Sequence, residues 1–407
     1  MRKLKIFQIN HMFLDGGGRE EHIFHISKEL IQRGHDVSVI TSDYMASGEP
    51  LIGQKARQIP GFKIITLKGY QTQIPPGRIL IPDLMETLLK INNANADIIH
   101  AHGMGEQVAQ DAFYAAKIKG IPFVFTPHFH PWWSYEKLHA QRIWKVLQET
   151  QLKMIAEHSD ALISVSETGQ KDFIKYVKYK GKNMVVIPNG LDPNLKVPSK
   201  EEIRAVWEKF KIPLNKKYII FLGSVTNPRK GALEAVQVFR QVREKMPDVH
   251  MLVVGPWSSR YISTTPVLKI VEKLAKAKYV TVTGYVNESD KYSLLAGADV
   301  MVNPTVYEAF GIVLAEALYC KTPVVATKVG GVPYVVRDKI DGFLIKEQTN
   351  ISAFVRACLR LLRNPELAKK MGQAGHERVK RKFQWDKVAQ KLEELYYRVI
   401  ERNQKKK

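Results

Sequence analysis

The chain has 407 residues, of which 45% are hydrophobic and 25% are charged. This composition is that of an ordinary globular protein and excludes disordered, collagen-like and fibrous classes, and the length suggests two domains or three. The formal net charge of +22 favours an anionic partner, namely nucleic acid, an acidic membrane surface or a phosphorylated substrate. Cys320 and Cys358 are too few for a disulfide framework and lie in apolar helical patterns, which predicts two small core residues.

The basic residues are mostly dispersed, with local excesses at 171–182 and in the tail 377–407. Zinc-finger spacing, an aromatic RNA-binding signature and a basic-region zipper are all missing from the sequence, so nucleic acid is not an expected partner. The apolar runs are much shorter than the roughly 18 residues of a membrane span, and the first residues have no signal-peptide h-region. We therefore expect a cytoplasmic protein, with a peripheral contact on the inner face of an acidic membrane as an option.

The first half of the chain alternates short β-prone runs with stretches that have apolar residues at helical spacing. KIFQIN (5–10) is typical of a strand, the helix predicted at 18–34 ends at Gly34, and the Pro-rich stretch 74–82 is interpreted as a loop. The other predicted strands lie at 36–41, 62–67, 97–103, 123–128, 161–166 and 184–188, and the other predicted helices at 83–93, 105–119, 136–157 and 167–177.

A Pro- and Lys-bearing stretch at 191–202 separates this pattern from a second one of the same kind. The second pattern predicts strands at 217–223, 250–255, 279–284, 299–304, 323–327 and 342–345, and helices at 230–245, 265–276, 289–296, 312–319, 333–337, 351–363, 365–381 and 385–402. Strands separated by helices imply right-handed βαβ units and parallel sheets. The predicted fold class is therefore α/β, with doubly wound Rossmann-like domains at 1–192 and 203–384 and a C-terminal helix and basic tail at 385–407. Because ligands bind beyond the carboxyl ends of parallel strands, we expect the two domains to face one another across a cleft.

The segment 304–331 has the most informative pattern of reactive residues. Glu308 precedes a predicted helix, and Glu316 lies about one turn inside it. Carboxylates in this arrangement suit hydrogen bonds to sugar hydroxyls, and the helix N-terminus favours an anion. The amides expected to point outward there belong to Phe310, Gly311 and Ile312. Two glutamates at this spacing are common by chance on solvated helices, but the surrounding P-T-x-x-E-A-F-G-x-x-x-x-E-A pattern is much more specific.

A glycine run, Gly16 to Gly18, follows the first strand and opens the first helix, where its backbone could cradle a phosphate. The dinucleotide fingerprint G-x-G-x-x-G requires glycine where this chain has Glu21, so hydride transfer is not expected.

His128 ends the strand FTPH at the mouth of the expected cleft and could hydrogen-bond a sugar hydroxyl. His100, His102 and His130 are weaker candidates, because buried structural histidines are common. No thiol or clear carboxylate partner accompanies these four histidines, so we expect no metal site.

Taken together, the motifs resemble those of the family-4 retaining glycosyltransferases (glycosyl transferases group 1), which have the GT-B fold with two Rossmann-like domains. The resemblance covers nearly the whole chain, and the motifs follow the family's order. They are GGREEH (17–22), RGHDVSVIT (33–41), DIIHAHG (97–103), FTPH (125–128), VIPNGLD (186–192), FLGSVTNPRKG (221–231), VTGYV (282–286), AGADVMVNP (296–304) and the segment 304–331.

The resemblance implies a role for several residues of the second domain. Glu316 matches the glutamate that holds the nucleotide ribose, Glu308 matches the one beside the donor sugar, and Lys230 matches the lysine that clamps the donor diphosphate. Ser224 stands where the family has the arginine partner of that lysine. Arg229 is the alternative cation, although its side chain is expected to point elsewhere on a regular turn.

In the first domain, Gly17 and Gly18 match the family's glycine-rich turn against the donor phosphate, and His128 matches its functional histidine. The resemblance thus predicts a retaining transfer of a hexosyl group, such as mannose or glucose, from a UDP- or GDP-linked sugar to an acceptor hydroxyl. It implies no metal and no other cofactor.

The expected acceptor is a carbohydrate or a lipid-linked molecule. Aromatic residues in the basic segment 130–145, namely Trp132, Trp133 and Tyr135, together with the Lys-rich stretch 171–182, favour a lipid-linked one. Two alternatives stay open: a nucleotide-sugar epimerase of the same fold, and a non-catalytic protein that binds sugar nucleotides or polyanions. Turnover of the donor separates an enzyme from a binder, and the identity of the product separates a transferase from an epimerase.

Overall fold

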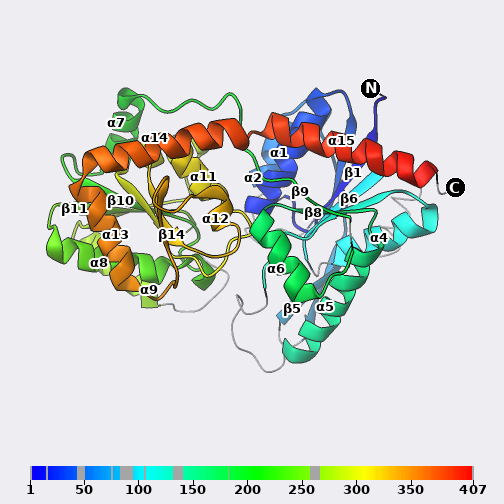
Figure 1. Cartoon of the computed structure of the whole chain (residues 1–407), viewed down its shortest axis with the longest axis horizontal. Helices are drawn as coiled ribbons and strands as arrows, with labels where there is room; N and C mark the ends of the chain where they lie inside the picture. Colours follow the sequence, from blue (N-terminus) through cyan, green and yellow to red (C-terminus); the bar gives the residue numbers. More distant parts are fainter. Residues whose placement is uncertain are drawn as a thin grey trace. The chain divides into compact units, whose positions relative to one another are not determined.

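The computed structural model describes residues 2–14, 17–43, 51–74, 77–82, 95–104, 107–131, 141–181, 183–256 and 266–405. The chain forms two compact units (Figure 1): unit 1 comprises Met1–Gly190 and Trp385–Lys407, and unit 2 comprises Leu191–Gln384. Each unit is built around its own parallel sheet. The predicted α/β fold class with two doubly wound domains is confirmed.

Unit 1 contains a seven-stranded parallel sheet with the order β3-β2-β1-β6-β7-β8-β9. Its elements are β1 (Lys5–Ile9), α1 (Gly18–Gln32), β2 (Asp36–Ser42), α2 (Leu51–Arg57), β3 (Lys63–Leu67), β4 (Gly69–Ile74), β5 (Gly77–Pro82), β6 (Ile98–His102), α4 (Gln107–Lys119), β7 (Phe123–Thr126), α5 (Gln141–His158), β8 (Ala161–Ser164), α6 (Glu167–Val177), β9 (Met184–Val186) and α15 (Trp385–Gln404). The strand order reverses between β1 and β6. Doubly wound sheets bind their ligands at such a switch point, beyond the carboxyl ends of the strands.

Helices cover both faces of this sheet. Helices α1 and α2 connect strands that follow one another in one direction from β1, and α4, α5 and α6 connect strands in the other direction. Right-handed crossovers therefore place the two sets on opposite faces. Helix α15 packs along α1 (Figure 1). Its buried apolar residues join a core cluster with residues of β1, α1 and β6, and they are Trp385, Val388, Leu392, Leu395, Tyr396, Val399 and Ile400.

Buried polar contacts attach α15 to the rest of unit 1. The Tyr396 hydroxyl accepts a hydrogen bond from Gln8 Nε2 (3.0 Å) and donates one to His100 Nδ1 (2.7 Å). Glu393, further along the same helix, accepts a hydrogen bond from the ring of buried His35 at 2.8 Å. The last helix is thus part of the first folding unit and not an appendage to the second.

Unit 2 contains a six-stranded parallel sheet with the order β12-β11-β10-β13-β14-β15. Its elements are α7 (Lys200–Lys209), β10 (Lys217–Leu222), the 3-10 helix η2 (Pro228–Lys230), α8 (Ala232–Lys245), β11 (Val249–Val254), α9 (Pro266–Lys276), β12 (Val280–Gly284), α10 (Glu288–Ala296), β13 (Val300–Asn303), α11 (Ile312–Tyr319), β14 (Val324–Thr327), α12 (Val332–Val335), β15 (Gly342–Ile345), α13 (Ile351–Arg363) and α14 (Pro365–Lys382). The order reverses between β10 and β13, which defines the switch point of this unit.

The strands of unit 2 are buried on both faces, as expected for a parallel sheet. Every residue of β11 is buried, and α8, α9 and α13 form the core on one face. Cys320 and Cys358 are both buried free cysteines, so the prediction that they are core residues is confirmed.

Three short elements differ from the prediction. The loop predicted at 74–82 is wrong, because β4 and β5 form an antiparallel pair, and a proline is tolerated at the end of a strand in such a two-stranded sheet. Helices α2 and α7 were not predicted. Helix α7 begins with a capping box, in which Ser199 accepts from the Glu202 amide and Glu202 accepts from the Ser199 amide. The helix predicted at 83–93 lies outside the described residues.

Candidate functional site

The residues predicted to bind a donor in unit 2 cluster at its switch point. The chain leaves β10 and forms η2, which carries Arg229 and Lys230, and it leaves β13 in the loop that carries Glu308. The two loops touch: Gly231 has φ of 73°, and a Cβ there would lie 1.9 Å from the carbonyl oxygen of Pro304. Only glycine permits both this backbone conformation and this approach.

The site's first ion pair joins Lys230 and Glu308. The ammonium nitrogen lies 2.6 Å from Glu308 Oε1, and only 25% and 10% of the two side chains are exposed. The backbone of Glu308 is also fixed, because its carbonyl accepts a hydrogen bond from the Gly331 amide at 2.7 Å. The structure therefore places the predicted diphosphate lysine next to the predicted sugar-side glutamate.

A second ion pair involves Glu316 on α11. Its Oε1 lies 2.5 Å from Lys291 Nζ and 3.4 Å from the hydroxyl of Tyr292, and both partners come from α10. Glu316 is 5% exposed, so its carboxylate is compensated by an ammonium group inside the protein. Lys291 was not among the predicted site residues. It lies 25 residues before Glu316, and nothing in its local sequence marks it.

The N-terminus of α11 presents backbone amides beside these pairs. Gly311 is the N-cap residue, with φ of 95°, and no side chain among the described residues caps this helix end. The Phe310 ring is buried and packs edge-to-face on Phe383 at 5.2 Å, so Phe310 contributes its amide and not its ring. Ile312 is the first helical residue. Uncapped amides at a helix start are suitable donors to a phosphate oxygen.

The two other basic-loop positions lie in different surroundings. Arg229 directs Nη1 towards the carbonyl oxygen of Tyr307 at 3.5 Å. The Ser224 hydroxyl lies 3.4 Å from the hydroxyl of Thr226. Lys230 is thus the predicted cation that contacts a predicted carboxylate.

In unit 1, Gly17 is the N-cap residue of α1 and Gly18 begins the helix. The carboxylate of Glu20 folds back over this turn, because a Cβ on Gly17 would lie 2.4 Å from Glu20 Oε2. Glu20 Oε1 accepts from Arg19 Nε at 3.0 Å and from Asn10 Nδ2 at 3.3 Å. A phosphate at this glycine turn would therefore meet a carboxylate that already has basic and polar partners.

Three histidines converge at the carboxyl edge of the unit 1 sheet. His22 lies one turn inside α1, His102 ends β6, and His128 follows β7. One ring nitrogen from each lies within 4.8 Å of the other two. His22 Nδ1 lies 2.7 Å from Asn189 Oδ1, His102 Nε2 lies 2.8 Å from Gln8 Oε1, and His102 Nδ1 lies 3.3 Å from His128 Nε2.

Burial keeps these rings neutral. It lowers the pKa of His22 to about 4 and holds the pKa values of His102 and His128 well below their usual range. We assign the tautomers from the hydrogen bonds. Asn189 accepts from Nδ1–H of His22, and Gln8 accepts from Nε2–H of His102, so His22 Nε2 and His102 Nδ1 hold lone pairs.

The backbone at His128 is strained. Its φ is 47°, in the left-handed region that side chains other than those of Gly and Asn rarely occupy, and such a residue costs about 1–3 kcal/mol. This conformation ends β7 two residues before the predicted end of the strand. Strain of this kind often lies at functional sites.

The other histidine candidates have structural partners. His100 uses both ring nitrogens, with Tyr396 and with Thr126 at 2.7 Å. The His130 ring contacts the carbonyl oxygen of His128 at 2.7 Å. Sequence reasoning gave no role to His22, although it ends the motif GGREEH.

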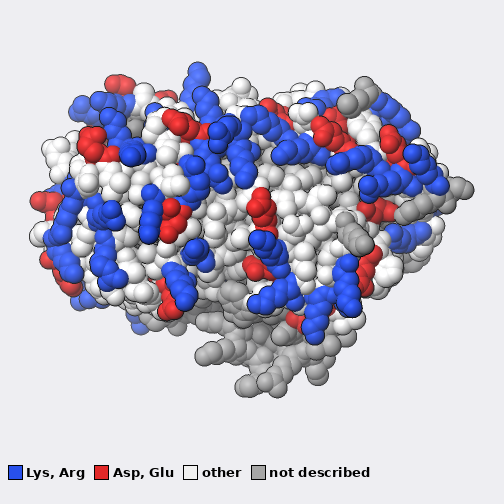
Figure 2. Space-filling view, in the orientation of Figure 1, with Lys and Arg blue, Asp and Glu red and all other residues white. Residues whose placement is uncertain are grey.

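The surface features predicted to contact a membrane are described in part. Trp132, Trp133 and Tyr135 lie outside the described residues. In the stretch 171–182, α6 exposes Ile174 and Tyr176 beside lysines. Figure 2 shows Lys and Arg interspersed with Asp and Glu over the visible face. Among the described residues, no helix has both the length and the apolarity to cross a membrane.

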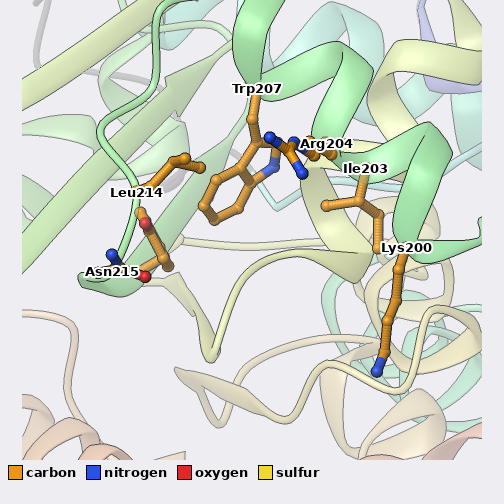
Figure 3. Close-up of a pocket in the computed structure, with 7 residues that line it drawn as sticks. Lys200, Ile203, Arg204, Trp207, Leu214 and Asn215 are labelled. Carbon is orange, nitrogen blue, oxygen red and sulfur yellow. The ribbon is translucent and has the colours of Figure 1, made fainter.

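A surface pocket of unit 2 lies at the other edge of its sheet, where β10 begins. Figure 3 shows the Trp207 indole facing Leu214 and Asn215. Tyr218, near the start of β10, also lines this pocket, which places it away from the carboxyl-edge residues described above.

Comparisons with known proteins match both halves of the chain. Residues 16–195 match the family model described as Glycosyltransferase Family 4, and residues 201–378 match the one described as Glycosyl transferases group 1. The phosphatidylinositol N-acetylglucosaminyltransferase GPI3 subunit of Saccharomyces cerevisiae is 26% identical over 93% of this chain and 79% of its own length. The alpha-maltose-1-phosphate synthase of Mycolicibacterium smegmatis is 29% identical over 78% of this chain and 83% of its own length.

Solved structures share the fold of the whole chain. Sucrose-phosphate synthase from Thermosynechococcus elongatus has a TM-score of 0.76 and 22% identity, and the match covers 98% of this chain and 99% of the other. Anabaena HepE in complex with UDP and glucose has a TM-score of 0.75 and 19% identity, with 96% and 98% covered.

Proposed function

Because the chain belongs to the group 1 glycosyltransferases, we propose that it transfers a hexosyl or N-acetylhexosaminyl group from a nucleoside-diphosphate sugar to an acceptor hydroxyl, with retention of the anomeric configuration. The observation that carries the proposal is the pair of lysine–glutamate contacts at one edge of unit 2, Lys230–Glu308 and Lys291–Glu316. Carboxylates suit sugar hydroxyls and ammonium groups suit phosphates, so this edge offers both to a sugar nucleotide.

The donor is assigned to unit 2. Glu316 accepts hydrogen bonds from the ribose, Lys230 and the amides at the start of α11 hold the diphosphate, and Glu308 orients the sugar. These fixed positive groups stabilise the charge that develops on the leaving diphosphate, so no divalent cation is needed at that position. The nucleotide is UDP or GDP. UDP is tested first, because HepE, which shares the fold, binds it.

The acceptor is assigned to unit 1, with His128 beside the reacting sugar. A lipid-linked acceptor is supported by the GPI3 relative, whose name includes phosphatidylinositol. The exposed Ile174 and Tyr176 on α6, next to lysines, would suit a peripheral contact with an anionic membrane surface.

The first test is a thermal-shift series with UDP, GDP, ADP and their sugars, without added metal. A ligand at 100 times its Kd stabilises the folded chain by about 2.7 kcal/mol. We expect one nucleotide series to raise the melting temperature of the wild type and of Glu377→Gln, an exposed control on α14, and to lose most of this effect in Glu316→Gln. If no nucleotide shifts the wild type, the proposal is wrong.

Transfer itself needs a second assay. With the donor that binds, we expect release of the nucleoside diphosphate to rise when a membrane extract or lipid-linked sugar supplies the acceptor. NMR of the product's anomeric proton then reports retention or inversion. Conversion of the donor sugar into its epimer without an acceptor would instead identify an epimerase.

A further inference from the structure

We propose that His22, His102 and His128 in unit 1 form a binding site for a divalent transition metal, with Zn²⁺ as its first candidate. This site is separate from the donor-binding residues of unit 2 and is not required by the proposed function. It rests on three observations: the spacing of the ring nitrogens, the partners of the outer nitrogens, and the burial of the rings.

The spacing already suits two zinc ligands. Two imidazole nitrogens bound to one tetrahedral zinc, each about 2.0–2.1 Å from the ion, lie about 3.3–3.4 Å apart. His102 Nδ1 and His128 Nε2 lie 3.3 Å apart. The nitrogen of His22 lies within 4.8 Å of both, so a ring movement of at most about 1.5 Å would complete three ligands at the same spacing.

The outer nitrogens are held as they are in metal sites. A metal-bound histidine almost always donates its other N–H to a fixed acceptor, which orients the ring and sets the tautomer. His22 does so to Asn189, and His102 does so to Gln8. Gln8 is itself oriented, because its amide nitrogen donates to Tyr396.

His100 gives an internal contrast. Its ring stacks next to that of His102, with centroids 4.0 Å apart, and it is equally buried. Both of its nitrogens already have partners in Tyr396 and Thr126, so it has no lone pair for a metal. The lone pairs of His22 and His102, by contrast, point towards the same space.

The site has an open side. His22 and His102 are 3% and 0% exposed, whereas His128 is partly exposed. To bind, His128 moves its proton from Nε2 to Nδ1, and no ring needs to lose a charge because all three are neutral. Three nitrogen ligands leave a fourth position, as in catalytic zinc sites. That position would take an oxygen ligand, either water or a hydroxyl group of the substrate.

The competing explanation is a purely structural network, in which Nε2–H of His128 donates to Nδ1 of His102. The two explanations differ in metal binding, so the test uses the full chain without a histidine tag, stripped with a chelator and dialysed. Zn²⁺ is titrated and counted by elemental analysis, and Co²⁺ is added separately because a four-coordinate cobalt site absorbs visible light strongly.

We expect one tightly bound Zn²⁺ per chain and a four-coordinate Co²⁺ spectrum. His22→Gln and His102→Gln should each weaken binding at least about 100-fold, the upper range for loss of an outer-shell partner alone. His158→Gln, an exposed histidine at the end of α5, is the matched control and should bind like the wild type.

Well under one Zn²⁺ per chain, or a six-coordinate Co²⁺ spectrum in the wild type, would overturn the proposal in favour of the structural network. Because this measurement uses the wild type, it holds even if a histidine variant fails to fold. It is also independent of the donor site: a chain that binds nucleotide and no metal contradicts only this inference, and one that binds metal and no nucleotide contradicts only the proposed function.

Discussion

Lys230 and Glu308 are 78 residues apart in the chain, yet their side chains meet at 2.6 Å beside the switch point of unit 2. A donor diphosphate that binds Lys230 must therefore compete with a carboxylate for the same ammonium group. Glu308 is in this sense an internal anion that occupies the place of the ligand, and removal of either partner should shift nucleotide affinity in opposite directions.

Lys230→Met should weaken UDP binding by about 10- to 100-fold, because a charge-assisted hydrogen bond contributes about 1.5–3 kcal/mol. Uridine, which lacks the diphosphate, should bind the variant and the wild type equally well. Isothermal titration calorimetry with both ligands measures this difference, and Lys245→Met on the exposed end of α8 is the control. Equal losses for uridine and UDP would mean that Lys230 does not contact the phosphates.

Glu308→Gln should keep or raise UDP affinity, because the ammonium of Lys230 no longer has a competing carboxylate. Transfer should fall, since the residue that orients the sugar has lost its charge. The paired measurement is a UDP titration and a turnover assay on the same preparation. A large loss of UDP affinity in this variant would contradict the competition described above.

Lys291→Met should destabilise unit 2, because it leaves the buried carboxylate of Glu316 without its ammonium partner. Breaking a largely buried pair costs about 3–5 kcal/mol, and the partial exposure of Lys291 places the expected loss at about 2–3 kcal/mol. The double variant Lys291→Met/Glu316→Gln should regain part of this loss in urea unfolding, since no unpaired charge remains. Lys276→Met, on exposed α9, is the control, and additive effects of the two changes would contradict the pairing.

Gly231→Ala should be much more harmful than Gly284→Ala, although both glycines have similar φ values of 73° and 70°. A Cβ at Gly284 meets nothing within 4 Å, whereas one at Gly231 meets the carbonyl oxygen of Pro304. Gly284→Ala should cost about 1 kcal/mol for the backbone conformation, and Gly231→Ala a further 1–3 kcal/mol or so for the displaced loop. Urea unfolding checks both, and equal costs would show that the two loops part freely.

His250 should make unit 2 less stable in acid. Burial lowers its pKa to about 4, and its ring contacts the Thr281 hydroxyl at 2.8 Å. Between the ordinary pKa of 6.5 and pH 4, the unfolded chain binds a proton that the folded chain does not, so stability falls as the pH falls. His250→Gln should flatten this part of the curve by about 2 kcal/mol. The same slope in the variant and the wild type would contradict this role.

The order of helices and strands could be predicted because each strand is a short apolar run and each helix has its own periodicity. The buried strand β11, for example, has one uninterrupted apolar pattern around His250. The exceptions are short or polar. Helix α7 buries only Val206 and Trp207, too few for a periodic signal, and its capping box at Ser199 was the local sign that could have identified it.

The site was predictable only where a motif marks it. Lys230, Glu308 and Glu316 lie in distinctive segments. Lys291 lies on a helix without any such motif, and its contact with Glu316 exists only because α10 and α11 pack together. The convergence of His22 with His102 likewise depends on α1 and β6 meeting at the switch point, which no spacing along the chain reveals.

The membership of α15 in unit 1 has a consequence for protein synthesis. All of unit 2, Leu191–Gln384, leaves the ribosome before residue 385 does. Until then, the apolar face that receives α15 remains uncovered, and Gln8 and His100 lack the hydroxyl of Tyr396. Domains generally fold as units as they emerge, so a nascent chain halted just before Trp385 would carry a finished unit 2 and an unfinished unit 1. The domain that is translated first is the last to be completed.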